Sequence, residues 1–271
     1  MVKCQVLMDA MNRIAPKKLA EEWDNPGLLV GSPQQEVARV LICLDVSDEV
    51  VEQAIHRDAR LIISHHPILF RAIKAVRTDL PIGRRLEKLL KHDIAVFAAH
   101  TNLDSALGGV NDVLAEKIGL VDIVPLEAAD RMEEDALPAL GRMGRLPAPM
   151  SAKDFAEHVR SLLPTSAVRL TEAGTHPVQK VALCSGSGAD FISKAAFLGA
   201  DAYVTGDVRY HDAQHAKEAG IHLIDAGHFG TEFPIVHALK TRLEQELGKQ
   251  AEFVELLEDT ESKDFFEVIC E

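Results

Sequence analysis

The sequence has few cysteines and no long apolar run. Its four cysteines stand at positions 4, 43, 184 and 270, far apart and without a C-x-x-C pair. That spacing excludes a zinc ribbon and a disulfide scaffold, and it is typical of a protein from a reducing compartment. No apolar run approaches the length of a membrane span, and charge interrupts the first residues too early for a signal peptide. We therefore expect a cytoplasmic protein with no membrane partner.

Positive charge is also scarce. Lysine and arginine number 29 against 42 aspartates and glutamates, which gives a net charge of −13. This balance argues against broad binding of nucleic acid through its phosphates. Only a positive strip concentrated inside an enclosed site or a ring would be compatible with a nucleic-acid partner.

What is present is an ordinary globular composition with a regular alternation of elements. The chain has 271 residues, of which 47% are hydrophobic and 26% charged, enough for one large or two modest domains. Apolar strands alternate with amphipathic helices, which predicts an α/β fold. Together with the repeat and the histidines described below, this pattern indicates two related α/β halves packed around a central metal-containing cleft. We place the first half at 1–126, an acidic and then Gly- and Pro-rich connection at 127–149, and the second half at 150–271. A helix is expected from about Thr231 to Leu247, and a last edge strand over Phe265 to Ile269.

The two halves repeat each other in sequence. A shift of 141 positions lays Val37 onto Val178 and continues without a gap for nearly thirty residues, through Ser64 on Thr205. A shift of 128 then lays His100 and Asp104 onto His228 and Glu232, each pair a histidine followed four residues later by a carboxylate. We interpret this pattern as a duplication, which would bring matching strand ends to one cleft.

Two adjacent histidines follow the strongest strand of the first half. Leu61 to Ser64 reads as a buried parallel strand, and His65 and His66 come directly after it, before Pro67 ends the strand. In open α/β sheets, ligands bind at the carboxyl ends of strands. Because consecutive side chains of an extended chain point to opposite sides, each imidazole could take a different metal ion.

A set of imidazoles and carboxylates at strand ends therefore forms the candidate metal site. Each residue alone is more commonly a capping or turn residue, but two adjacent histidines and two histidine–carboxylate pairs together indicate metal. Imidazole with carboxylate and no thiolate suits zinc, iron, manganese or cobalt. A carboxylate can also bridge two cations about 3.5–4 Å apart, a recurring arrangement in hydrolases. The candidate ligands are His65, His66, Asp104, His228 and Glu232.

Five motifs in this order resemble the Nif-three-like family of dinuclear-metal proteins, whose members also carry the name GTP cyclohydrolase 1 type 2. They are Trp-Asp-Asn-x-Gly-Leu (23–28), Ser-His-His-Pro (64–67), His-Thr-Asn-Leu-Asp (100–104), Thr-Gly-Asp (205–207) and Gly-His-x-x-Thr-Glu (227–232). The resemblance spans nearly the whole chain. The short connection makes the chain similar to the family form without an inserted domain, and Gly230 departs from the family pattern, which more often has a larger residue there.

The resemblance also implies a ligand set and an assembly. It implies two divalent metal ions per subunit, zinc, iron or manganese, with a carboxylate and a water able to bridge them. One ion would be held by His65, Asp104 and Glu232, and the second by His66 and His228. The implied assembly is a hexameric toroid whose metal sites face its interior.

Other residues near these motifs have two readings each. His100 is either a proton shuttle or partner behind the ligands, or a packing histidine. The turn 185–188, Ser-Gly-Ser-Gly, could cradle an anion on its N–H groups, but it lacks the full spacing of a phosphate loop, which favours a plain tight turn. Asp207 and His211 would either contact substrate or begin a solvated helix.

Two remaining groups have a structural interpretation. The segment 23–25, Trp-Asp-Asn, reads as a fixed turn beneath the site. Cys43 and Cys184, at matched positions of apolar strands, are core residues.

Two classes of function follow. The first is a metal-dependent hydrolase acting on a small molecule, by purine-ring opening at C8 of GTP as the resemblance suggests, or by nucleotide or phosphoester hydrolysis. The sequence has no guanine- or triphosphate-reading motif. The second is a non-catalytic metal-binding oligomer, a scaffold or metal handler, or a ring around a nucleic-acid or protein partner.

Overall fold

The computed structural model describes residues 1–126 and 139–269, which form two compact units. Unit 1 comprises residues 1–106 and 235–262, and unit 2 comprises residues 107–234 and 263–271. The units therefore differ from the predicted halves, 1–126 and 150–271, at two places. The strand after residue 120 joins the sheet of unit 2, and the chain returns to unit 1 after residue 234. Of the predicted connection 127–149, residues 127–138 lie outside the described residues.

Unit 1 is built on a five-stranded sheet in the order β13-β4-β5-β6-β2. Four of its strands run parallel, and β2 pairs antiparallel at one edge. A two-stranded ribbon, β1 with β3, accompanies the sheet. The strands are β1 (Val2–Lys3), β2 (Gly27–Val30), β3 (Glu36–Val37), β4 (Arg39–Cys43), β5 (Leu61–Ser64), β6 (Ala95–Ala98) and β13 (Glu255–Glu258).

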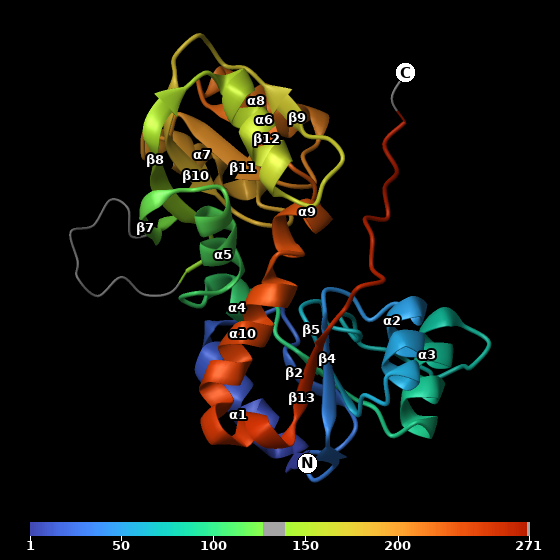
Figure 1. Ribbon diagram of the computed structural model, residues 1–271. Helices are drawn as coiled ribbons and strands as arrows, with labels where there is room; N and C mark the ends of the chain where they lie inside the picture. The colour runs from blue at the N-terminus through green and yellow to red at the C-terminus, as the bar shows by residue number, and fades with distance from the viewer. Residues whose placement is uncertain (127–138, 270–271) are drawn as a thin grey trace. The chain divides into compact units, whose positions relative to one another are not determined.

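Helices cover both faces of this sheet (Figure 1). On one face, α2 and α3 pack on Leu41 of β4, Ile62 of β5 and Val96 of β6. The neighbouring helices α1 and α10 lie on the other face. The side chain of Ser47 caps the start of α2 by accepting from the N–H of Val50. The elements are α1 (Cys4–Ile14), α2 (Asp48–His56), α3 (Pro81–Lys91), α4 (Thr101–Ser105), α10 (Ile235–Leu247), and the 3₁₀ turns η1 (Lys17–Leu19) and η4 (Gly248–Phe253).

Unit 2 repeats this architecture with a six-stranded sheet in the order β7-β8-β10-β11-β12-β9. The three strands β10, β11 and β12 are parallel, and the outer strands pair antiparallel. Most of β8 lies within the predicted connection 127–149. The strands are β7 (Val121–Pro125), β8 (Arg142–Met150), β9 (Arg169–Thr171), β10 (Val178–Leu183), β11 (Ala202–Thr205) and β12 (His222–Asp225).

Alternate residues of β10 divide the core of unit 2 into two layers. Val181 and Leu183 pack with α5 and α6, whereas Ala182 and the following Cys184 pack with α7 and α8. Burial of Cys43 and Cys184 confirms the prediction that both are core residues. The helices are α5 (Val110–Lys117), α6 (Ala152–Leu162), η3 (Ala189–Phe191), α7 (Ile192–Phe197), α8 (Tyr210–Glu218) and α9 (His228–Glu232).

The backbone register shows the repeat that the sequence predicts. In unit 1, Val40 pairs with Leu61. In unit 2, Val181 pairs with Ala202, and both positions are shifted by 141. A third parallel strand follows in each unit, β6 and β12, so each contains the same β-α-β core. Matching strand ends therefore carry His65-His66 in unit 1 and Gly206-Asp207 in unit 2.

Two expected elements differ from the structure. The helix expected from Thr231 to Leu247 is two helices, α9 and α10, because Pro234 between them has no N–H to continue the hydrogen-bond ladder. The edge strand expected over Phe265 to Ile269 is wrong, since these residues form no ladder and Phe265, Phe266 and Ile269 are exposed. Strand β13 takes the edge position instead and buries two leucines.

Within the described ranges, none of the helices combines the length and the apolar character that a bilayer crossing requires.

Candidate metal centre

Three histidines gather at the carboxyl edge of the sheet in unit 1. His65 and His66 follow β5, and His100 follows the neighbouring strand β6. Their ring centroids lie 5.0 Å (His65 to His66), 5.2 Å (His65 to His100) and 5.6 Å (His66 to His100) apart. One nitrogen of each lies within 4.8 Å of the others, so this group could hold a metal ion.

The expectation that the two adjacent imidazoles point to opposite sides is wrong. The extended strand ends at Ser64, and residues 65 and 66 form a bend. The hydroxyl of Ser64 donates to the carbonyl of His66 at 2.8 Å across this bend. The strand alternation therefore no longer applies to the two rings, and they lie side by side at the strand end.

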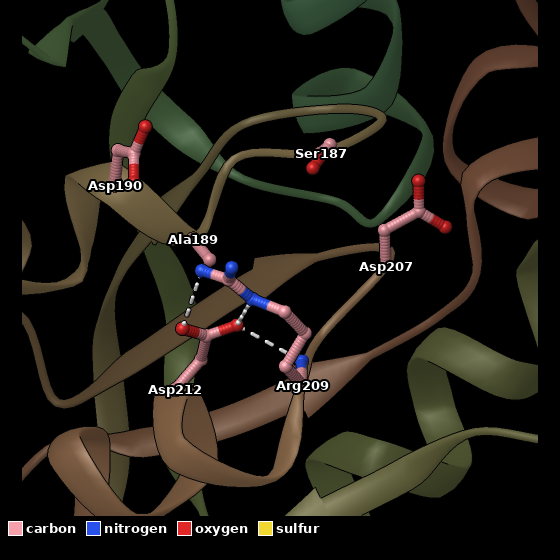
Figure 2. A pocket seen from close by; sticks show the side chains of 6 residues that line it. All are labelled: Ser187, Ala189, Asp190, Asp207, Arg209 and Asp212. Atoms are coloured by element: carbon pink, nitrogen blue, oxygen red, sulfur yellow. Dashed lines mark hydrogen bonds and ion pairs between the residues drawn. The ribbon is translucent and has the colours of Figure 1, made fainter.

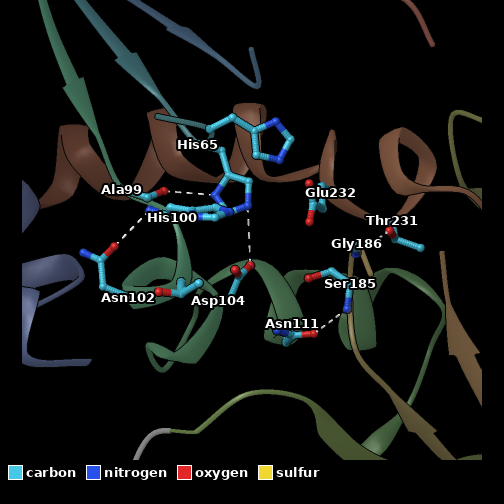
Figure 3. A network of polar contacts seen from close by, with 12 residues as sticks. His65, Ala99, His100, Asn102, Asp104, Asn111, Ser185, Gly186, Thr231 and Glu232 are labelled. Carbon is cyan, nitrogen blue, oxygen red and sulfur yellow. Dashed lines mark hydrogen bonds and ion pairs between the residues drawn. The ribbon is translucent and has the colours of Figure 1, made fainter. Parts of the chain in front are cut away.

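Each of the adjacent histidines has its Nδ1 held by an oxygen. The Nδ1 of His65 lies 2.9 Å from the carbonyl oxygen of Ala99 (Figure 3), and the Nδ1 of His66 lies 2.8 Å from Oδ1 of Asp45. A hydrogen bond from Nδ1–H to such an oxygen fixes the ring orientation and leaves Nε2 as the atom able to bind a metal. This arrangement is typical of metal-ligating histidines. The Nε2 of the buried His65 is 3.5 Å from Oδ1 of Asp104.

Asp24 orients His100 and accepts hydrogen bonds from Thr101, the first residue of the short helix α4. Its Oδ1 lies 2.8 Å from Nδ1 of His100, and its Oδ2 accepts from the N–H and the hydroxyl of Thr101 at 3.0 and 2.5 Å. Burial acts to raise the pKa of Asp24, but the hydrogen bonds from His100 and Thr101 outweigh it and lower the pKa to about 2. The carboxylate is therefore charged at neutral pH. Asp24 of the Trp-Asp-Asn turn thus holds His100 and Thr101 in place.

In unit 2, the second histidine–carboxylate pair lies on one turn of helix α9. The spacing of four residues puts His228 and Glu232 on the same face, with Nε2 of His228 3.0 Å from Oε2 of Glu232. Oδ2 of Asp207 holds Nδ1 of His228 at 2.7 Å. The backbone of Asp207 has a positive φ of 53°. Because its carboxylate holds Nδ1 of His228, Asp207 orients this histidine and is not only part of a helix start.

The turn Ser185–Gly188 is occupied by internal hydrogen bonds. The N–H groups of Ser185 and Gly186 donate to the side chains of Asn111 and Thr231 at 2.8 and 3.0 Å (Figure 3). The N–H of Gly188 donates to the hydroxyl of Thr205 at 3.0 Å. Three of its four N–H groups therefore already have acceptors, which favours the plain turn over an anion cradle. Gly186 has φ +60°, and a Cβ there would overlap Oε1 of Glu232 and lie 3.3 Å from Nε2 of His228.

A polar pocket of about 370 Å³ lies beside Asp207 (Figure 2). Its lining includes Arg209, which donates to Asp212 from Nε and from a terminal nitrogen at 3.0 and 3.1 Å. These bonds raise the pKa of Arg209 and lower the pKa of Asp212. His211 is exposed at the start of α8, beside Gln214, and does not line this pocket.

Sequence reasoning did not single out Asp45, and it had no reason to assign Asp24 or Asp207 to particular histidines. Asp45 follows β4, the strand next to β5. Its position at the carboxyl edge is a signal that could have found it. The assignment of each carboxylate to one ring needed the spatial order of the strands.

Comparison with known proteins gives one consistent family. A model of the family described as Duf34/NIF3 (NGG1p interacting factor 3) matches residues 2–262. A Clostridium perfringens protein named GTP cyclohydrolase 1 type 2 homolog is 34% identical over 268 residues, covering 99% of this chain and 100% of that protein. A Streptomyces coelicolor protein of the same name is 35% identical over 237 residues, covering 86% and 83% of the two chains.

Solved structures with high TM-scores support the same fold. The crystal structure of a Bacillus cereus protein related to NIF3 has a TM-score of 0.92 and 28% identity, with 99% of each chain covered. The crystal structure of Staphylococcus aureus protein SA1388 is similar at a TM-score of 0.90 and 31% identity, again with 99% of each chain covered.

Proposed function

From the premise that this chain belongs to the Duf34/NIF3 family, we propose that it is a hydrolase that depends on two divalent metal ions per subunit. The histidine group of unit 1 and the α9 pair of unit 2 would together supply the ligands of both ions. The proposed ligands of the first ion are His65, Asp104 and Glu232. Those of the second are His66 and His228.

The observation that supports this proposal most is the way the three ligand histidines are held. The Nδ1 atoms of His65, His66 and His228 each lie 2.7–2.9 Å from a carbonyl or carboxylate oxygen. Such partners are characteristic of metal ligands, because they fix the tautomer and raise the basicity of Nε2. A histidine that only packs has no need of a carboxylate behind its ring, and here two of the three have one.

Two divalent ions such as zinc, iron or manganese would supply a hydroxide nucleophile near neutral pH and polarise a carbonyl or phosphoryl group. The carboxylates of Asp104 and Glu232 would offset the positive charge of the ions. His100 donates from Nδ1 to the ionised Asp24, which leaves Nε2 as the atom that would accept a proton from water or return it to the leaving group. His100 is therefore the proposed proton carrier of the site.

The relatives' name directs the choice of substrate. Proteins named GTP cyclohydrolase 1 type 2 homolog are 34% and 35% identical to this chain. We therefore propose purine-ring opening of GTP, or hydrolysis of another nucleotide or phosphoester, as the reaction. The pocket beside Asp207 has polar and charged lining residues, as a hydroxyl-rich substrate would require.

Metal-dependent turnover tests the proposed function. Protein stripped with a chelator and then reloaded with zinc, iron or manganese is assayed on GTP, other nucleotides and phosphoesters. We expect turnover only in the reloaded protein, and its loss in His66→Ala. His237→Ala is the matched control, because His237 is an exposed histidine that pairs with Glu258 on another part of unit 1.

Two results would contradict this proposal. Unchanged turnover in His66→Ala would show that the proposed ligands do not carry the activity. Two retained ions per chain with no turnover on any substrate would favour the alternative, a non-catalytic metal-binding scaffold or metal handler.

We also propose that the chain assembles as a hexameric toroid with its metal sites facing the interior, as the family resemblance implies. Light scattering in solution should then give about six times the chain mass of 29.6 kDa. A monomer or dimer at micromolar concentration would contradict the assembly and would leave the metal chemistry of the single chain to be judged separately.

A further inference from the structure

Two exposed aromatic rings in unit 1 stand beside His100. Trp23 is 60% exposed and Phe70 is 48% exposed, although both are large apolar side chains. Their ring centroids are 5.8 Å apart at an interplanar angle of 69°. Each ring centroid also lies 6.0 Å from that of His100.

Hydrogen bonds hold the backbone segments that carry these two rings. The side-chain amide of Asn25 donates to the carbonyl of Leu69 at 2.8 Å, which ties the turn of Trp23 to the segment of Phe70. On the other side of Asn25, Asp24 is fixed by its bonds to His100 and Thr101. The hydrogen bonds of the two residues that follow Trp23 thus hold an exposed aromatic pair in place, and ordering such a pair only to leave it in water gives no stability.

We propose that Trp23 and Phe70 form a stacking site for a planar heteroaromatic ring of the substrate. Two aromatic rings at a steep angle offer one face and one edge, and a third planar ring can stack on the first and meet the second edge-on. Stacking on aromatic side chains is a common way to bind a nucleobase, because every base has a π-face.

The location ties this ring site to the proposed chemistry. His100 contacts both aromatic rings, and its own ring lies 5.2 and 5.6 Å from those of His65 and His66. A planar group stacked on Trp23 would therefore be next to the proposed proton carrier, His100. The ring of His100 in turn neighbours those of two proposed metal ligands. The assignment of the ring to the substrate rests on the proposed function, whereas the binding of a planar ring does not need metal.

The protein carries its own reporter for this site, because Trp23 is its only tryptophan. The full chain, with metal and after chelation, is titrated with guanosine 5′-monophosphate while tryptophan emission is followed. We expect saturable quenching in both forms and none with ribose 5-phosphate, which has the sugar and phosphate but no planar ring.

Substitution of Phe70 separates stacking from general contact. Phe70→Leu keeps an apolar side chain and Trp23 but removes the second ring, so it should weaken binding about tenfold, the size expected for one lost stacking partner. The matched control is Phe197→Leu, which changes an exposed phenylalanine of unit 2 and should leave the titration unchanged. Unchanged circular dichroism would show that both variants are folded.

Four results would overturn the ring site. Three come from the titrations: no saturable quenching, equal quenching by ribose 5-phosphate, or equal binding by Phe70→Leu and the parent protein. The fourth is a tryptophan emission typical of a buried indole, because Trp23 would then be covered and not open to a ligand. Quenching that persists while every substrate fails would support the ring site and contradict the hydrolase, so the two failures are distinguishable.

Discussion

Alanine in place of Glu232 is expected to remove at least one of the two proposed ions from each chain. Glu232 is 4% exposed and lies 3.0 Å from Nε2 of His228, so its carboxylate is positioned among the ligands. Residues that only orient metal ligands change metal affinity by about 10–100-fold, and loss of a ligand should exceed that. Metal analysis of dialysed protein, together with competition against a chelator, measures the change.

Two glycines provide a substitution that leaves Glu232 in the sequence but disturbs its position. Gly186→Ala would place a Cβ against Oε1 of Glu232, at a backbone φ of +60°. Gly199→Ala is the matched control, since Gly199 has a similar φ of +74° but nothing within 4 Å of the new Cβ. Both substitutions carry the same kind of backbone strain. Only Gly186→Ala should lower metal affinity, and it should do so with Glu232 intact.

Full metal content in Glu232→Ala would show that this carboxylate is not a ligand. Equal metal affinity in the two glycine variants would show that the space beside Gly186 has no bearing on the site.

Alanine in place of Arg142 is expected to destabilise unit 2 by about 3–5 kcal/mol, the cost of breaking a buried ion pair. Arg142 begins β8, is 0% exposed, and holds Asp112 of α5 with two bonds of 2.5 and 3.0 Å. Its third nitrogen donates to the carbonyls of Ala139 and Gly141 at 2.6 and 2.9 Å. Removal of the guanidinium would leave a buried carboxylate without its counter-ion, although the N–H of Gly108 still donates to it. The carbonyl of Ala139 would lose this donor, whereas that of Gly141 still accepts from the N–H of Leu126.

Urea unfolding followed by circular dichroism measures this loss, with Arg145→Ala as the control. Arg145 lies on the same strand, and among the described residues its side chain bonds only to Gln179, at 3.3 Å on the surface, so its loss should cost less than about 0.5 kcal/mol. Trp23 lies in unit 1, so its emission is followed alongside as a probe placed outside unit 2. Equal stability of the two arginine variants would contradict the prediction.

Much of the site was predictable because its signals are local in the sequence. The apolar run Leu61–Ile63 predicts a buried strand, and the residues after it lie at a sheet edge in any parallel arrangement. A histidine and a carboxylate four residues apart share one helical face, which the structure shows for His228 and Glu232. The repeat at a shift of 141 is likewise a property of the sequence, and the strand register preserves it.

The sequence by itself determined most of the segments that form strands and helices, and which histidines stand at strand ends, because hydrophobic periodicity and spacing act over a few residues. The tertiary structure decided the partners of the polar groups. Asp45 holds His66 across 21 positions and Asp24 holds His100 across 76. The tertiary structure likewise decided the pairing of β13 with the first sheet and the burial of Arg142. A buried polar group must find a partner, but which one it finds depends on the segments that packing brings beside it.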